Sequence, residues 1–357
     1  MAGNIPSKKK IVVPISDDLQ SYLRRYGRSV ELPLQYDDLT HYESSIPLED
    51  HEGNPTYWEQ VFYNEYDREN LYRSLTRIYS LLKTDGDTDV LQHLTVARVD
   101  YCTFGNTKPF RIRIINGLND NYDHFYIKKS DASRIYGAEL EELLSPNSFM
   151  YLHHGDTLIE EHIAGIPGDD FIRKNLADTT FNQIRIAKEF VKFNERCFVR
   201  LLGDMRAYNY VVDITPDIEG SQYRMRAIDF DQQSYEGGSS FYQPKYFKEN
   251  NPIIFLGQQH MTVDTMKQYQ MEERSLIANR IKASKRRVSA LFSVMIKDEI
   301  SNPKKVEKLK KELAYHHSTK VFDHCKSMGE IVYENLKLVL AKEFKQSTAI
   351  FDLASDE

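Results

Sequence analysis

The chain has 357 residues, enough for two or three domain-sized units with a sizeable core. Hydrophobic residues make up 41% and charged residues 28%, and the net charge of −6 argues against a nucleic-acid partner. Three widely spaced cysteines suit a reducing compartment better than a disulfide framework. Since no apolar stretch is long enough to span a membrane and no signal peptide is recognised, we expect a cytoplasmic protein without a membrane partner.

Residues 1–93 are predicted to form an N-terminal extension. Residues 1–55 are rich in Pro, Asp, Glu and Ser and show no sustained hydrophobic period. Apolar residues then recur at helical spacing from Thr56 to Lys83, which predicts one long helix. The extension either packs on the main domain or recruits a protein partner, and the sequence leaves both open.

The hydrophobic period changes to two after residue 93, which indicates strands. A helix with Ser130 or Asp131 as N-cap interrupts them and ends at Ser145 and Pro146. We therefore predict an antiparallel sheet of five strands with one helix, the strands covering residues 94–104, 110–115, 124–129, 149–152 and 157–163.

The remainder of the chain, residues 164–357, is predicted to be mainly helical. One helix covers Phe181–Cys197, and two or more helices cover residues 265–298 and 303–345. Together with the preceding sheet, this order predicts an α+β protein.

Residues 201–233 carry the chemistry of the chain. The segment Gly203-Asp204-Met205-Arg206-Ala207-Tyr208-Asn209 contains Asp-x4-Asn, and Ala227-Ile228-Asp229-Phe230-Asp231 places an Asp after an apolar run. Two strands joined by a turn lie between them, so the open ends of a hairpin bring Asn209 and Asp229 together. Phosphoryl transfer needs one Asp near the attacking hydroxyl, and an Asn and a second Asp to hold magnesium. The Asp-x4-Asn spacing is that of kinase catalytic loops.

A five-stranded lobe, a linker and a helical lobe with these motifs resemble the protein-kinase-like fold. The closest branch is the small-molecule kinases, the aminoglycoside phosphotransferases and choline kinases. The resemblance implies a two-lobed fold with a small N-lobe and hinge over residues 94–163, a helical C-lobe over 164–357, and the helical extension before them. It also implies ATP and Mg²⁺ as cofactors.

The resemblance assigns Lys128 to the nucleotide phosphates, with Lys129 as the alternative. Because side chains alternate along a strand, one of the two lysines points inward and the other to solvent. Glu139 or Glu142 on the following helix is the implied partner of this lysine, and we prefer Glu139.

Two further segments of the N-lobe are implied to bind the nucleotide. The backbone from Glu161 to Ile163 corresponds to the hinge that holds adenine. Residues 103–109, with the single glycine Gly105, correspond to the phosphate-covering loop.

In the C-lobe, the resemblance implies Asp204 as catalytic base and Asn209 and Asp229 as magnesium ligands. Arg206, two residues after the base, stands where many protein kinases have a Lys that neutralises the transferred phosphate. A cation at this place is favourable because charge develops on the phosphoryl oxygens.

Several departures favour small-molecule kinases over protein kinases. Leu202 replaces a customary His, Asp231 stands where protein kinases have Gly after Asp-Phe, and neither Ala-Pro-Glu nor G-x-G-x-x-G is found. The sequence therefore predicts an ATP- and magnesium-dependent phosphotransferase acting on a small-molecule hydroxyl or amine acceptor. The alternatives are a protein kinase or other protein modifier, and a non-catalytic nucleotide-binding pseudokinase.

Overall fold

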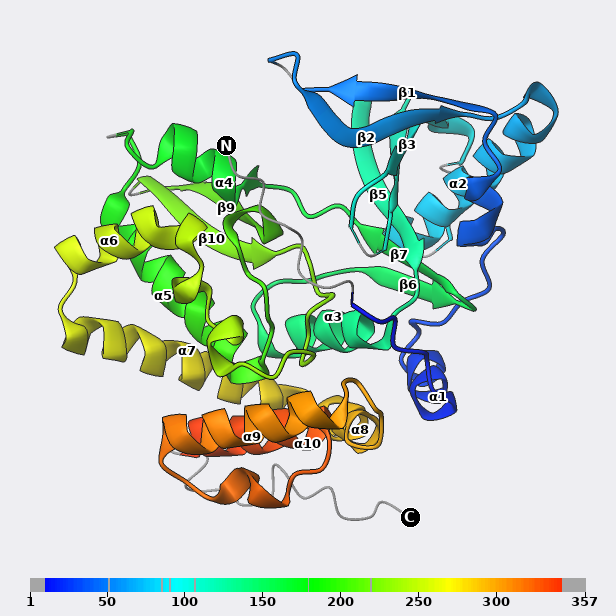
Figure 1. Cartoon of the computed structure of the whole chain (residues 1–357). Helices are drawn as coiled ribbons and strands as arrows, with labels where there is room; N and C mark the ends of the chain where they lie inside the picture. The colour runs from blue at the N-terminus through cyan, green and yellow to red at the C-terminus, as the bar shows by residue number, and fades with distance from the viewer. Residues whose placement is uncertain are drawn as a thin grey trace. The chain divides into compact units, whose positions relative to one another are not determined.

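The computed structural model describes residues 10–50, 52–84, 86–89, 91–105, 107–178, 180–218 and 220–341. Residues 342–345 of the last predicted helix and Asn106 of the predicted phosphate-covering loop lie outside this part of the chain. The chain divides into two compact units (Figure 1). Unit 1 comprises the chain up to Asp131 together with Met150–His162, and unit 2 comprises Ala132–Phe149 and the chain from Ile163 onward.

Unit 1 is built on an antiparallel sheet, in which seven strands are found among the described residues. Their spatial order is β1-β2-β3-β4-β5-β7-β6. The strands are β1 (Ser44–Glu49), β2 (Pro55–Phe62), β3 (Leu94–Cys102), β4 (Phe110–Asn116), β5 (Asn121–Lys129), β6 (Tyr151–His154) and β7 (Thr157–Glu161). The prediction of an α+β protein is confirmed, but that of five strands is wrong, because β1 and β2 from the region before residue 94 join the same sheet.

The second strand occupies a segment that was predicted to be helical. Trp58 on β2 faces Cys102 on β3, and the helix α2 (Glu65–Thr84) starts only after this strand ends. The segment 57–62 contains three aromatic residues and a valine, which favour a pleated, half-buried surface. Tertiary pairing with β3 therefore overrides the helical spacing of this segment. Helix α1 (Asp17–Arg25) is a further difference, because it lies in the region predicted to lack a hydrophobic period.

The hydrophobic core of unit 1 lies between α2 and the sheet. Leu75, Ile78 and Leu82 of α2 are buried and recur three and four residues apart, so they share one face of the helix. They join a cluster with inward-facing strand residues, among them Ile112 and Ile127. The strands β4 and β5 are thereby held on a rigid support.

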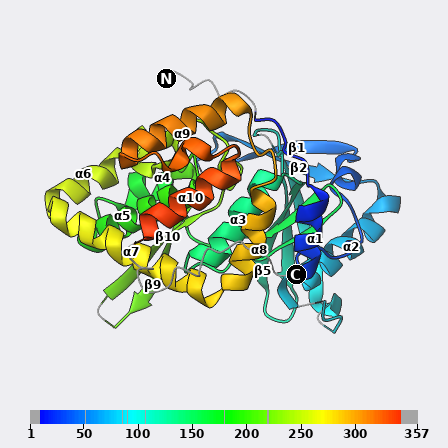
Figure 2. The ribbon, with the colours of Figure 1, turned by 90° about the horizontal axis from the view of Figure 1, so that it is seen from below.

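Unit 2 is mainly helical (Figure 2), and it carries a small sheet of order β10-β9-β8. Its helices are α3 (Ala132–Leu144), α4 (Gly168–Asp170), α5 (Gln183–Arg200), α6 (Asn251–His260), α7 (Val263–Ala283), α8 (Lys285–Met295), α9 (Pro303–His317) and α10 (Met328–Leu340), and its strands are β8 (Ile166–Pro167), β9 (Tyr210–Asp217) and β10 (Gly220–Ala227).

The predicted hairpin is confirmed in unit 2, with β9 and β10 paired antiparallel from Tyr210 opposite Ala227 to Asp217 opposite Gly220. Helix α5 packs on β10 and on α6 and α7, and its apolar face includes Ile186, Phe190 and Phe193. The loop that follows α5 and the segment that follows β10 therefore start side by side at the open end of the hairpin.

Within the described residues, no helix combines the length and the apolar character required to cross a lipid bilayer. Cys102, Cys197 and Cys325 are all buried and not joined in disulfides.

Candidate functional site

The loop that follows α5 has an unusual backbone. Leu201 and Asp204 adopt positive φ values of 55° and 60°, and Ser234, in the segment after β10, adopts 53°. Positive φ is uncommon outside glycine and costs free energy, most of all for a bulky residue such as Leu. Leu202 is fully buried and forms a bridge with Gln233, which joins the two segments.

Gly203 allows the loop to approach a second segment closely. A Cβ atom at this position would lie 2.6 Å from the ring of Phe241 and 3.1 Å from the carbonyl oxygen of Gln232. The backbone N–H of Asp204 then donates to the carbonyl of Phe241 at 3.1 Å. The strained loop is therefore fixed from two sides, and it presents Asp204 in a defined position.

The Asp204 carboxylate lies in a small charged cluster. Arg206 donates from Nε to Asp204 Oδ1 at 3.0 Å and from an Nη atom to Glu249 Oε1 at 2.8 Å. The Asn209 side-chain amide donates to the backbone carbonyl of Asp204 at 2.7 Å. The loop thus brings three sequence-predicted residues, Asp204, Arg206 and Asn209, into one site.

Burial raises the pKa of the Asp204 carboxyl from 3.8 to about 6. The hydrogen bond and the charge of Arg206 oppose this rise, whereas the negative charges of Asp229 and Glu249 add to it. A carboxyl with a pKa near 6 exchanges protons close to neutral pH, as a general base requires.

The hairpin brings the second acidic segment to the same place. The backbone N–H of Ile228 donates to the carbonyl of Asn209 at 3.0 Å, so Asp229 follows directly after this contact. The electrostatic effect of Asp229 on Asp204 is a second sign that both carboxylates belong to one site.

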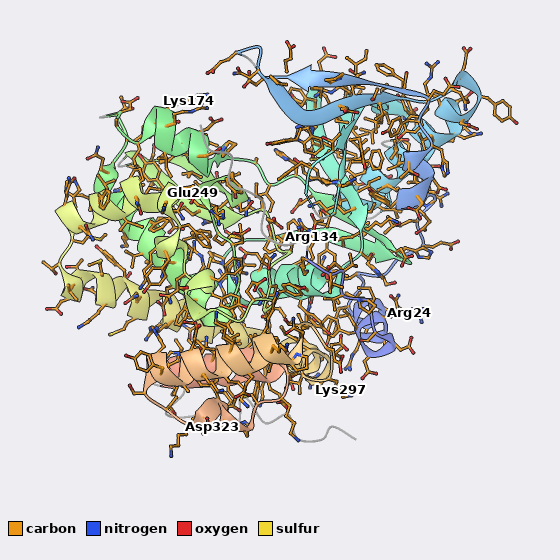
Figure 3. All side chains as sticks on the ribbon, in the orientation of Figure 1. Arg24, Arg134, Lys174, Glu249, Lys297 and Asp323 are labelled. Carbon is orange, nitrogen blue, oxygen red and sulfur yellow. The ribbon has the colours of Figure 1, made fainter. Side chains whose placement is uncertain are left out.

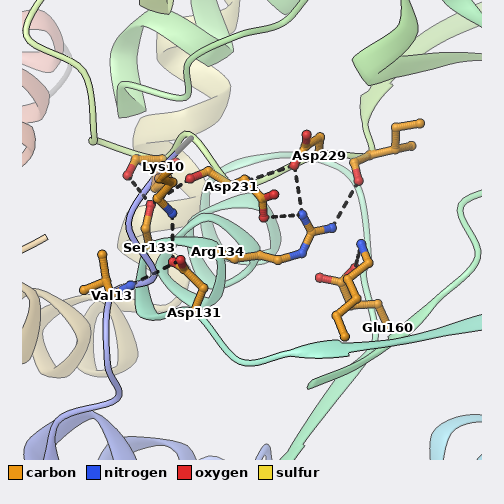
Figure 4. A network of polar contacts seen from close by, with 11 residues as sticks. Lys10, Val13, Asp131, Ser133, Arg134, Glu160, Asp229 and Asp231 are labelled. Atoms are coloured by element: carbon orange, nitrogen blue, oxygen red, sulfur yellow. Dashed lines mark hydrogen bonds and ion pairs between the residues drawn. The ribbon is translucent and has the colours of Figure 1, made fainter. Parts of the chain in front are cut away.

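A buried arginine on α3 holds the acidic segment. Arg134 Nη1 donates to Asp229 Oδ1 and to Asp231 Oδ1, both at 2.8 Å, and its side chain is only 2% exposed (Figure 4). The backbone N–H of Asp231 donates to the same Asp229 oxygen at 2.9 Å. Figure 3 labels Arg134, which binds Asp229 and Asp231, and Glu249, which accepts a hydrogen bond from Arg206.

The residues expected to hold magnesium fit one ion by their chemistry. Asn209 uses its amide nitrogen on Asp204, which leaves the amide oxygen as the ligand atom, and Asp229 supplies a carboxylate. One oxygen of Asp229 already accepts two hydrogen bonds, however. Among the described residues, no group of three or more His, Cys, Asp or Glu side chains has a metal-binding arrangement.

In unit 1, Lys128 is buried and Lys129 is exposed, which confirms the alternation expected along the strand. Lys128 Nζ donates to Glu160 Oε2 on the neighbouring strand β7 at 2.6 Å. The expected pairing of Lys128 with Glu139 is thus replaced by a pairing within the sheet. The reason is register: Leu158 lies opposite Lys128 on the adjacent strand, and Glu160 follows two residues later on the same face.

The carboxylate of Glu139 has an arginine partner in its own unit. Arg287 on α8 donates from two nitrogens to both carboxylate oxygens of Glu139, at 2.7 to 3.2 Å, and also contacts Glu142 at 3.2 Å. Glu139 is fully buried. Both helix glutamates considered for Lys128 therefore anchor α8 to α3.

The other predicted nucleotide-binding groups are distributed over the two units. Gly105 has φ of 90°, which favours glycine, and lies in unit 1 with Glu161, whereas Ile163 lies in unit 2. The N–H groups of Glu161 and His162 donate to Met150 and His124 carbonyls. Any adenine contact of the predicted hinge must therefore use its other backbone groups.

Unit 2 also contains an open groove of about 840 Å³, to which only residues with a polar or charged group contribute. One wall is the segment around Phe241, whose carbonyl binds Asp204, and another is α9. Hydroxyl, amide, imidazole and two opposite charges line it, from Ser239, Ser240, Gln243, Tyr246, Lys311, Glu312, Tyr315, His316 and Ser318.

Sequence reasoning missed Glu160, Arg134 and Glu249 as partners of the predicted residues. A Glu in the apolar strand around residue 160 was a usable signal, because such a carboxylate needs a cation nearby. No comparable pattern marks Arg134 or Glu249, which reach the site only through packing of distant segments.

Comparison with models of known protein families gives no match, and a search of curated proteins gives no match either.

Proposed function

We propose that this chain is an ATP- and magnesium-dependent phosphotransferase with a kinase-like site, acting on a small-molecule hydroxyl or amine acceptor. The observation that carries the proposal is Asp204: its carboxyl lies in a strained loop with Arg206 and Asn209, and its pKa of about 6 is influenced by Asp229. Backbone strain at such a place favours a functional role, since it persists only where the surroundings enforce it.

In the proposed reaction, Asp204 accepts the proton of the acceptor hydroxyl or amine. The acceptor atom forms the new bond to the γ-phosphorus, the bond to the β–γ bridging oxygen breaks, and ADP leaves. Arg206 lies at hydrogen-bond distance from Asp204, so its guanidinium is placed to stabilise charge on the transferred group.

Magnesium, held by Asn209 and Asp229, would neutralise charge on the nucleotide phosphates. In unit 1, Lys128 is kept as the proposed phosphate ligand, and its ammonium group is held by Glu160. The groove beside the Phe241 segment is the proposed acceptor site, because its hydroxyl and amide lining matches a polar acceptor.

The first test is nucleotide binding by thermal shift with ATP and magnesium. A ligand at 100 times its dissociation constant stabilises a protein by about 2.7 kcal/mol, which is readily measured. Asp204→Asn should retain this binding and lose phosphate transfer from labelled ATP to a panel of polar acceptors. Asp217→Asn, the same change on an exposed turn, should keep both. Absence of any nucleotide-induced shift in the wild-type protein would refute the proposal.

A non-catalytic nucleotide-binding protein is the second candidate, favoured by the contacts of Arg134 with both Asp229 and Asp231. A wild-type protein that binds ATP yet transfers phosphate to no acceptor, protein substrates included, would support this candidate instead.

A further inference from the structure

The Arg134 side chain is buried and does not lie along the protein surface. With only 2% of it exposed, one Nη atom bridges Asp229 and Asp231, and the other lies 3.4 Å from the carbonyl of Ile228. A planar guanidinium with a fixed set of donors suits such a bridging position. Arg134 therefore binds the acidic segment through side chains and backbone together.

The helix that carries Arg134 is fixed against the same segment. Ser133 Oγ donates to the carbonyl of Gln233 at 2.7 Å, and Gly137 approaches so closely that a Cβ atom would lie 2.8 Å from Phe230 Cβ. The distance between Arg134 and the two carboxylates is thus set by helix packing, and a small movement of the side chain alone cannot open the bridge.

The charges explain what the arginine does. Two carboxylates that share a hydrogen-bonding partner repel each other, and a site for nucleotide phosphates ordinarily offsets such repulsion with bound divalent ions. Here Arg134 contributes one positive charge between two negative ones, which leaves a formal charge of −1 on the three groups. A divalent ion approaching this pair meets a cation that is already in contact with both ligands.

We propose that Arg134 is the resident counter-cation of the Asp229–Asp231 pair and takes the place of a second metal ion. Arg134 then sets the metal requirement of the site: the intact chain binds at most one divalent ion there, and weakly. The inference builds on the proposed function in treating Asp229 as a metal ligand, but it concerns metal binding and not phosphate transfer.

The test measures Mn²⁺ binding to the full chain by electron paramagnetic resonance, without nucleotide. Arg134→Gln should bind Mn²⁺ at least about tenfold more tightly than the wild-type chain, since a nearby unit charge has been removed. Arg134→Lys, which keeps the charge, should stay close to wild type. Adding Asp229→Asn to Arg134→Gln should abolish the gain and so locate the ion.

Two further variants serve as a second test and as a control for the Mn²⁺ measurement. Arg134→Gln with Asp231→Asn removes one positive and one negative charge, so it keeps the net charge of the cluster and decides the matter if the single variant fails to fold. It should also bind Mn²⁺ more tightly than wild type, because the cation in contact with the Asp229 carboxylate is gone. Arg224→Gln removes an exposed arginine of β10 in the same unit, and should leave Mn²⁺ binding unchanged.

The inference is overturned if neither Arg134→Gln nor the double variant gains Mn²⁺ affinity, or if the wild-type chain already binds two ions at Asp229 and Asp231. Phosphate transfer by the wild-type chain together with either of these results would leave the proposed function intact. Tighter Mn²⁺ binding in the variants without any nucleotide binding would support the inference and reject the proposed function.

Discussion

Replacing the proposed catalytic base should stabilise the protein. The pKa of Asp204 is raised from 3.8 to about 6, so the folded chain holds this proton more tightly than the unfolded chain. The stability that this bound proton gives to the folded chain is fully present below pH 3.8 and is lost as the pH rises to about 6. Above that pH the charged carboxylate is buried at a cost, which the uncharged Asp204→Asn variant avoids.

The magnitude follows from the pKa. Because one pKa unit equals about 1.36 kcal/mol, a rise from 3.8 to about 6 corresponds to about 3 kcal/mol. The Asp204 side chain is 24% exposed, so solvent screens this effect only in part. We expect Asp204→Asn to raise the free energy of unfolding by up to about 3 kcal/mol at pH 7.5, and by little near pH 4.

Urea denaturation of the wild type and Asp204→Asn at pH 7.5, 6 and 4 would measure this difference. Asp217→Asn is the matched control, since hydrogen bonds lower the pKa of Asp217, the first of them from Gln222, and its replacement should not stabilise. A variant that is equally stable or less stable than wild type at pH 7.5, or a stability gain that does not depend on pH, would refute the reasoning.

Three other predictions concern rate and packing. If Asp204 is the base, kcat/KM for phosphate transfer should rise with pH around a midpoint near 6, and a flat profile from pH 5 to 8 would contradict this role. Lys128→Met should destabilise unit 1 by about 1.5–3 kcal/mol, because it removes the charged hydrogen bond that Lys128 donates to Glu160. Adding Glu160→Gln should cost less than the sum of the two single changes in urea denaturation. Gly203→Ala should lower the free energy of unfolding by about 1–3 kcal/mol and reduce phosphate transfer, because its methyl group would lie 2.6 Å from the Phe241 ring. Gly238→Ala is the control: its nearest contact would be at 3.9 Å, so stability and phosphate transfer should both be kept.

The sequence predicted those features that depend on local periodicity and turn chemistry. Alternating apolar residues located β3, β4 and β5, and the same alternation correctly predicted that one of Lys128 and Lys129 points inward and the other to solvent. The hairpin of β9 and β10 was also predicted, because its apolar runs flank a short polar turn. In each case the determining interactions lie within a few residues or between consecutive strands.

The strands before residue 94 could not be predicted in the same way. The segment 57–62 is compatible with a helix and with a strand, and pairing with β3, about forty residues later, decides between them. A helical period therefore does not predict a helix reliably in a segment whose aromatic and β-branched residues can pair as a strand.

Only the tertiary structure decided the partners of the charged residues. Lys128 was expected to bind a glutamate on α3, but strand register gave it Glu160, and Glu139 is held by Arg287. Likewise, Asp229 was recognised from its place after an apolar run, whereas its bridge to Arg134 depends on how α3 packs against a segment nearly a hundred residues away. Sequence pattern determined which groups could carry the chemistry, and packing determined which cation each one faces, because buried charges select partners by three-dimensional proximity.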